Sequence, residues 1–133
     1  YSKANDWNRT IMGTNYYLRK AKPRTVYDQM HMCKTSVGWT VHFQDSDDGW
    51  ADEAPVPDED VVPSFHSVSD IRRLLESGEW VIADEYGNAC KPGKESLDKL
   101  EELCGWHGPR EATDLRGSYR DDEGHLFTRT WFR

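Results

Sequence analysis

The sequence has no apolar run near the length of about 20 residues that a helix needs to cross a membrane. It is also poor in cysteine. Its three cysteines, Cys33, Cys90 and Cys104, are an odd and widely spaced set, which does not form a disulfide framework. We therefore expect no membrane association, and reduced thiols in a cytoplasmic compartment.

Positive charge is scarce as well. The chain carries 17 Lys and Arg against 24 Asp and Glu, for a net charge of -7 at pH 7. A surface that binds the phosphate backbone of a nucleic acid needs clustered positive charge. We therefore expect no direct nucleic-acid binding, and a partner with a basic surface instead.

Aliphatic residues are few, and aromatic residues compensate for them. Only 36% of the chain is hydrophobic, but 12% is Phe, Trp or Tyr. Each aromatic ring buries a large area, so 133 residues can form one compact domain without disulfide bonds. We expect a flexible N-terminal arm over 1–11 and a single domain over 12–133.

Periodicity predicts strands and helices in alternation. Two amphipathic helices are expected, the first after Ser67 or Ser69 and the second after Ser96, with Gly78 and Gly105 at their ends. Alternating apolar and polar residues predict the strands, which are 14–19, 26–34, 39–43, 80–83 and a hairpin within 115–132. The order predicts an α+β domain, a mostly antiparallel sheet with both helices packed on one face.

The stretch 45–60 differs from the rest of the chain. It contains eight acidic residues and no Lys or Arg, and Pro55 and Pro57 disfavour regular structure there. We predict a long acidic loop that binds a partner. Its candidate contacts are Asp45, Asp47, Asp48, Trp50, Asp52, Glu53, Asp58, Glu59 and Asp60. A calcium loop is excluded because Pro55 occupies the position that requires Glu.

The stretch 31–38 is the candidate ligand site. Lys34-Thr35-Ser36 lacks the glycines of a phosphate-binding P-loop, but a weaker anion site formed by Lys34, Ser36 and the turn amides stays open. His31, Asp84 and Glu85 are the other candidates.

Metal and nucleophile chemistry are weakly indicated. His31 and Cys33 share one face of an ideal strand, and Cys104 and His107 form a second half-pair, but a zinc site needs four ligands. We favour buried free cysteines and surface histidines, with no metal or cofactor. A nucleophile such as Ser36 or Cys33 activated by a histidine is open but not favoured.

Three motifs resemble those of a group of small proteins encoded by bacteriophages. They are Met-Gly-Thr-Asn-Tyr-Tyr at 12–17, His-x-x-Lys-x-Ser-x-Gly-Trp at 31–39 and Asp-Glu-Tyr-Gly at 84–87, with a less specific match at 122–127. The chain departs from the group at Cys33, where the group has Gly, and it lacks the group's frequent Cys-x-x-Cys between the first two strands. The resemblance implies a phage origin and no particular activity.

From these features we expect a non-enzymatic phage accessory protein in the host cytoplasm, which binds and inhibits a host or defence protein in the manner of an anti-CRISPR. One alternative is a site for a small anionic ligand or nucleotide at the 31–38 turn, acting as a sponge or a hydrolase. Another is a virion component.

Overall fold

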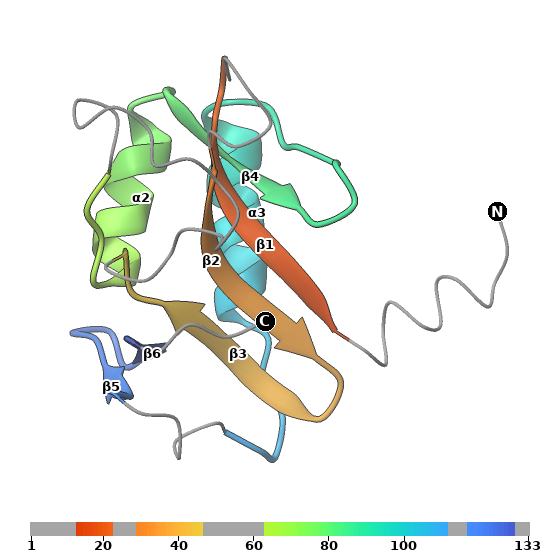
Figure 1. Cartoon of the computed structure of the whole chain (residues 1–133), viewed down its shortest axis with the longest axis vertical. Coiled ribbons are helices and arrows are strands. Elements are labelled where there is room, and N and C mark those ends of the chain that lie inside the picture. The colour runs from red at the N-terminus through yellow and green to blue at the C-terminus, as the bar shows by residue number, and fades with distance from the viewer. Residues whose placement is uncertain (1–12, 23–28, 47–62, 112–116, 130–133) are drawn as a thin grey trace, which may run out of the picture.

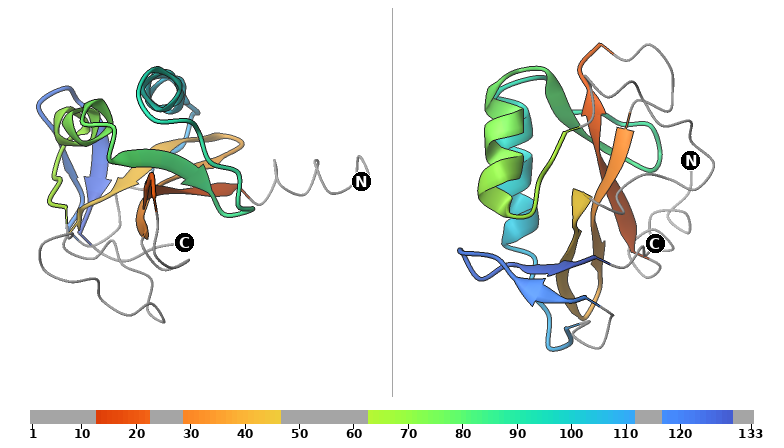
Figure 2. Two further views of the ribbon diagram at one scale, coloured as in Figure 1. Left: turned by 90° about the horizontal axis from the view of Figure 1, so that it is seen from above. Right: turned by 60° about the vertical axis from the view of Figure 1, so that its left-hand side comes forward.

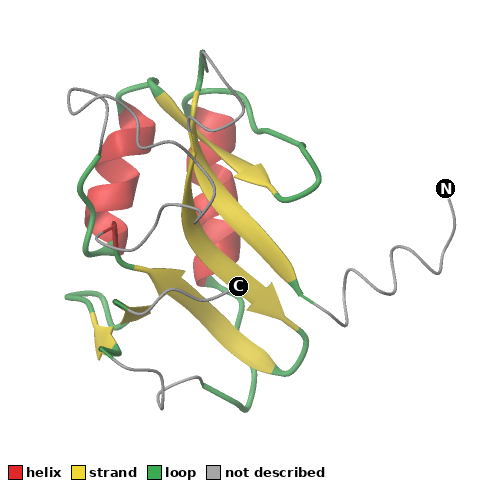
Figure 3. Ribbon diagram, in the orientation of Figure 1, coloured by secondary structure: helices red, strands yellow, loops and turns green. Residues whose placement is uncertain are grey.

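A six-stranded sheet and two helices make up the computed structural model, which describes residues 13–22, 29–46, 63–111 and 117–129 (Figures 1 and 3). The statements below concern these residues. In chain order the elements are β1 (Thr14–Lys20), β2 (Gln29–Ser36), β3 (Trp39–Gln44), α2 (Val68–Glu76), β4 (Trp80–Asp84), α3 (Lys94–Cys104), β5 (Tyr119–Arg120) and β6 (Leu126–Thr128).

The strand order across the sheet is β4-β1-β2-β3-β6-β5. All neighbours pair antiparallel except β3 and β6, which run parallel with Phe43 opposite Phe127. Both helices lie on the same side of this sheet (Figure 2). The predicted α+β class, with a mostly antiparallel sheet and helices on one face, is therefore confirmed.

The helix boundaries follow local capping chemistry. Ser67 caps α2, because its hydroxyl accepts a hydrogen bond from the Asp70 backbone N–H at 3.2 Å. Ser96 was expected to cap α3, but the N-cap is Gly93. The Ser96 side chain is buried in the first turn, donates to the Lys91 carbonyl and accepts from the Ile82 N–H, so it ties α3 to β4.

The core lies between the sheet and the helices. Its fully buried members come from every layer, and they include Leu18, Met32, Phe43, Phe65, Ile71, Leu75, Leu100 and Phe127. Phe43 and Phe127 stack with ring centroids 5.1 Å apart, which fixes β6 against β3.

Charged side chains join the two helices to the β5–β6 turn. The Arg72 guanidinium of α2 bonds Glu101 of α3 at 2.9 Å and Glu123 of the turn at 3.0 Å. The hydrogen bond from Arg72 lowers the pKa of the Glu123 carboxyl to about 2.

Some predictions fall outside the described residues or differ from the structure. The arm 1–11 lies outside them. The C-terminal hairpin is shorter than predicted, with two residues in β5 and three in β6 in the described part. No helix in this part is long and apolar enough to span a membrane.

Candidate functional site

The three resemblance motifs meet at the start of β1. Asn15 of β1 is the link: its Oδ1 lies 3.0 Å from His31 Nε2 on β2, and its backbone N–H donates to Glu85 Oε1 at 2.8 Å. Two of the predicted site residues, His31 and Glu85, are therefore joined through Asn15. Asn15 belongs to the motif at 12–17 but is not among the residues predicted for the site.

Lys34 and Ser36 meet the same motif at Gly13. A Cβ on Gly13 would lie 2.4 Å from Ser36 Oγ and 3.1 Å from Lys34 Cε, and Gly13 has a φ of +83°. Only glycine fits both the close approach and this backbone conformation. The contact positions the end of β2, which carries Lys34 and Ser36, against the start of β1.

Asp84 serves the turn that follows β4. Its carboxylate accepts hydrogen bonds from the Tyr86 and Asn88 backbone N–H groups, each at 2.9 Å, and from Asn88 Nδ2 at 3.0 Å. Such bonds define an Asx-type turn. These three bonds of Asp84 stabilise the turn, and the turn carries Glu85 to the Asn15 N–H.

A register shift separates His31 from Cys33. On β1, Tyr17 pairs with His31 and the adjacent Tyr16 pairs with Cys33. Adjacent strand residues project to opposite faces, so this β-bulge sends His31 and Cys33 to opposite faces as well. The prediction that they share a face is wrong.

The burial of these residues bears on the zinc alternative, which was not favoured, and on the expectation of surface histidines. Cys33 lies in the core, and burial raises the pKa of its thiol well above the usual value. His31 and His42 are buried rather than on the surface, whereas His107 is exposed. Among the described residues, no group of three or more His, Cys, Asp or Glu side chains could hold a metal ion.

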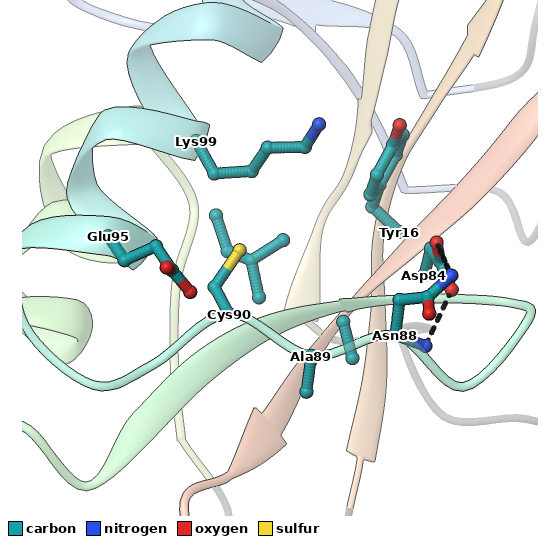
Figure 4. Close-up of a pocket in the computed structure, with 9 residues that line it drawn as sticks. Tyr16, Asp84, Asn88, Ala89, Cys90, Glu95 and Lys99 are labelled. Atoms are coloured by element: carbon teal, nitrogen blue, oxygen red, sulfur yellow. Dashed lines mark hydrogen bonds between the residues drawn. The ribbon is translucent and has the colours of Figure 1, made fainter.

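A pocket of about 200 Å³ opens between β1, β4 and α3 (Figure 4). Tyr16, Cys90 and Lys99 line it, and the Lys99 ammonium lies 5.2 Å from the centroid of the Tyr16 ring. Burial raises the pKa of the Tyr16 phenol and of the Cys90 thiol, so both stay protonated at neutral pH. Neither Tyr16 nor Cys90 is therefore an activated nucleophile.

The first residue of the acidic stretch is part of the fold. Asp45 is fully buried, and its Oδ2 accepts from the Tyr119 hydroxyl at 2.7 Å and lies 2.8 Å from His66 Nδ1. The expectation that Asp45 contacts a partner is therefore wrong, because it has no exposed surface. The other candidate partner contacts, Asp47, Asp48, Trp50, Asp52, Glu53, Asp58, Glu59 and Asp60, lie outside the described residues.

The two ends that flank these acidic residues are bonded to each other. The Ser46 N–H donates to the Phe65 carbonyl at 3.1 Å, and the Phe65 N–H donates to Ser46 Oγ at 3.0 Å. The Tyr119 hydroxyl also lies 2.8 Å from the His66 carbonyl oxygen. We call Asp45, Ser46, Phe65, His66 and Tyr119 the loop clasp. Sequence reasoning missed His66 and Tyr119, since nothing local marks a residue that bonds 53 positions away.

Exposed apolar side chains gather at the β2–β3 turn, at the other end of β3 from the loop clasp. Val37 is 55% exposed, and Trp39 and Trp106 are each 37% exposed. Trp106 Nε1 donates to the Ser36 carbonyl at 3.0 Å, and the Arg110 guanidinium lies 5.7 Å from the Trp39 ring centroid. Trp106 itself lies in the segment that follows α3.

Comparison with known proteins adds no relative. No protein-family model matches the chain, and no curated protein or solved structure matches it significantly. The site is therefore interpreted from its own geometry.

Proposed function

We propose that the protein is a phage-encoded accessory protein that binds and inhibits a host or defence protein. The contact is made by the acidic segment 47–60, which occupies a basic surface of the partner, as an anti-CRISPR inhibitor would occupy a nucleic-acid groove. The segment contains seven acidic residues and no Lys or Arg, so it concentrates negative charge in a chain of net charge -7.

The observation that carries the proposal is the loop clasp at the base of this segment. Ser46 and Phe65 are 19 positions apart but share two hydrogen bonds, and buried Asp45 anchors one end to Tyr119. A segment whose ends are held together loses less conformational freedom on binding than an open chain of the same length. A fixed base with concentrated charge suits recognition of a basic surface.

The test is capture of the partner from host lysate with the tagged protein at low and high salt, followed by mass spectrometry. We expect one stoichiometric partner that is lost at high salt, because exposed charges are screened beyond about 10 Å at 0.1 M salt. A salt-insensitive partner, or none, would contradict the proposal.

A charge variant locates the contact. Replacing acids 47, 48, 52 and 53 with Asn or Gln should abolish capture. The matched control makes the same change of net charge at four exposed acids of the described surface, which are Glu76, Glu79, Asp98 and Asp122. Equal loss in both variants would mean that total charge, rather than the acidic segment, drives binding.

A virion component stays an alternative with its own readout. It predicts the protein in purified phage particles and no salt-sensitive partner in lysate.

A further inference from the structure

A second pocket opens on the sheet face opposite the helices. It has a volume of about 210 Å³ and is formed by β1, β2 and the turn after β4. Leu18 belongs to the core under the helices, so its neighbours Tyr17 and Arg19 project to the other face. The lining residues are Tyr17, Arg19, Gln29, Asp84, Glu85 and Gly87.

Arg19 is the cation of this pocket. Its Nε is buried and meets no hydrogen-bond acceptor among the described residues. A buried guanidinium N–H without an acceptor costs free energy, and native proteins seldom leave one so. Nε itself has no accessible surface, but Arg19 as a whole is only partly buried and lines the pocket, so an oxyanion would meet the exposed part of this side chain.

The two carboxylates in the pocket are held by other donors. Asp84 accepts from the amides of its own turn, and Glu85 Oε1 accepts from the Asn15 N–H. Through Asn15, Glu85 is also linked to buried His31, whose ring packs edge-on against Tyr17 at 5.6 Å. The lining of the pocket thus combines Arg19 with two carboxylates that other donors already hold.

We propose that this pocket binds a small metabolite through a carboxylate or phosphate group. The oxyanion lies on Arg19, whose planar N–H groups match its geometry, with the Gln29 amide beside it. The second oxygen of Glu85 accepts from an ammonium or hydroxyl group of the same ligand. The volume is below the range of about 300–1,000 Å³ typical of drug-sized sites, which favours a ligand smaller than a nucleotide.

This inference is independent of the acidic segment, and it differs from the ligand site expected at the 31–38 turn. His31, Lys34 and Ser36 do not line the pocket, whereas Asp84 and Glu85 do. Arg19, which the sequence reasoning passed over, takes the role assigned there to Lys34.

Four probes test whether the pocket prefers a carboxylate or a phosphate, and whether an ammonium group on the ligand adds affinity. They are acetate, glycine, inorganic phosphate and phosphoethanolamine, titrated into ¹⁵N-labelled protein while the Arg19 Nε–H and Gly87 N–H signals are followed. We expect a saturable shift at both signals for at least one probe, with a Kd below about 10 mM. The absence of such a shift for all four probes would overturn the proposal.

Variants assign the contact. Arg19→Gln should weaken the best probe about tenfold or more, as expected for loss of a charged hydrogen bond. Lys22→Gln removes the same charge from an exposed position and should leave the affinity unchanged. Glu85→Gln should weaken glycine or phosphoethanolamine, but not acetate or phosphate. Equal affinities in Arg19→Gln and the wild type would refute the assignment.

Two further variants cover folding and the link to the proposed function. If Arg19→Gln does not give a folded spectrum, Arg19→Lys keeps the charge but removes the Nε–H, and it should still weaken the best probe. The variant neutralised at 47, 48, 52 and 53 should bind the probes like the wild type, so failure of either proposal leaves the other testable.

Discussion

The Tyr119→Phe substitution tests the loop clasp. It removes only the hydroxyl, which lies 2.7 Å from Oδ2 of the fully buried Asp45. The ring stack on Phe127, with centroids 5.6 Å apart, and the Arg129 guanidinium 4.5 Å from the ring centroid can both remain. The change therefore removes the contacts of this hydroxyl with the buried carboxylate and, at 2.8 Å, with the His66 carbonyl oxygen, and leaves the ring in place.

A hydrogen bond to a charged group contributes about 1.5–3 kcal/mol, and a buried carboxylate that loses a donor keeps its desolvation cost. We expect the free energy of unfolding to fall by about 2 kcal/mol, which lowers the Tm by roughly 5–10 °C in a domain of this size. Urea denaturation should show a lower midpoint with an unchanged m-value.

Tyr16→Phe is the matched control, because the Tyr16 hydroxyl makes no hydrogen bond within the described part of the chain. It should change the free energy of unfolding by less than about 0.5 kcal/mol. If the two variants lose equal stability, the hydrogen bond between Tyr119 and Asp45 does not hold the clasp and the reasoning is refuted.

Three other outcomes follow from the structure. Gly13→Ala should destabilise the fold more than Gly38→Ala, since both glycines have positive φ but only Gly13 would drive a Cβ into Ser36; paired denaturation curves measure the difference. Because the pKa of Glu123 is lowered in the folded state, its ion pair stabilises the fold above about pH 4.5, and this stabilisation is lost as the pH falls toward 2. Glu123→Gln should therefore lower the free energy of unfolding by about 1 kcal/mol or less at pH 7 and leave it unchanged near pH 2. Denaturation curves recorded across this pH range measure the difference. Burial raises the pKa of the Cys33 thiol, so this thiol should resist alkylation at pH 7.5 in the native protein and react fully in denaturant, as followed by mass spectrometry.

Local chemistry was sufficient to predict most of the secondary structure. The capping serine of α2, the glycine after it and the apolar spacing of Ile71 and Leu75 are signals within one helix, and they gave the correct element. Contacts between distant segments were not accessible in this way. The parallel pairing of Phe43 with Phe127 joins residues that are far apart in the sequence, and no periodicity within either strand specifies its partner.

In the candidate site, too, residues marked by a local motif were predictable, and residues whose environment depends on a distant segment were not. The motif residues His31 and Glu85 were predicted, and the structure brings them together through Asn15. The β-bulge that separates His31 from Cys33 depends on pairing with β1, so strict alternation along β2 misplaced Cys33. Asp45 looked like part of the acidic loop because its neighbours are acidic, but its environment is set by Tyr119, 74 positions later.

The loop clasp also has a consequence for how this protein can change over time. Because Ser46 and Phe65 are bonded to each other, the chain between them can be lengthened, shortened or exchanged while the sheet and helices stay as they are. Doubling the length of such a closed segment costs only about 0.6 kcal/mol of loop entropy. A lineage could therefore replace the sequence between these two residues, and with it the surface presented to other molecules, at little risk to folding.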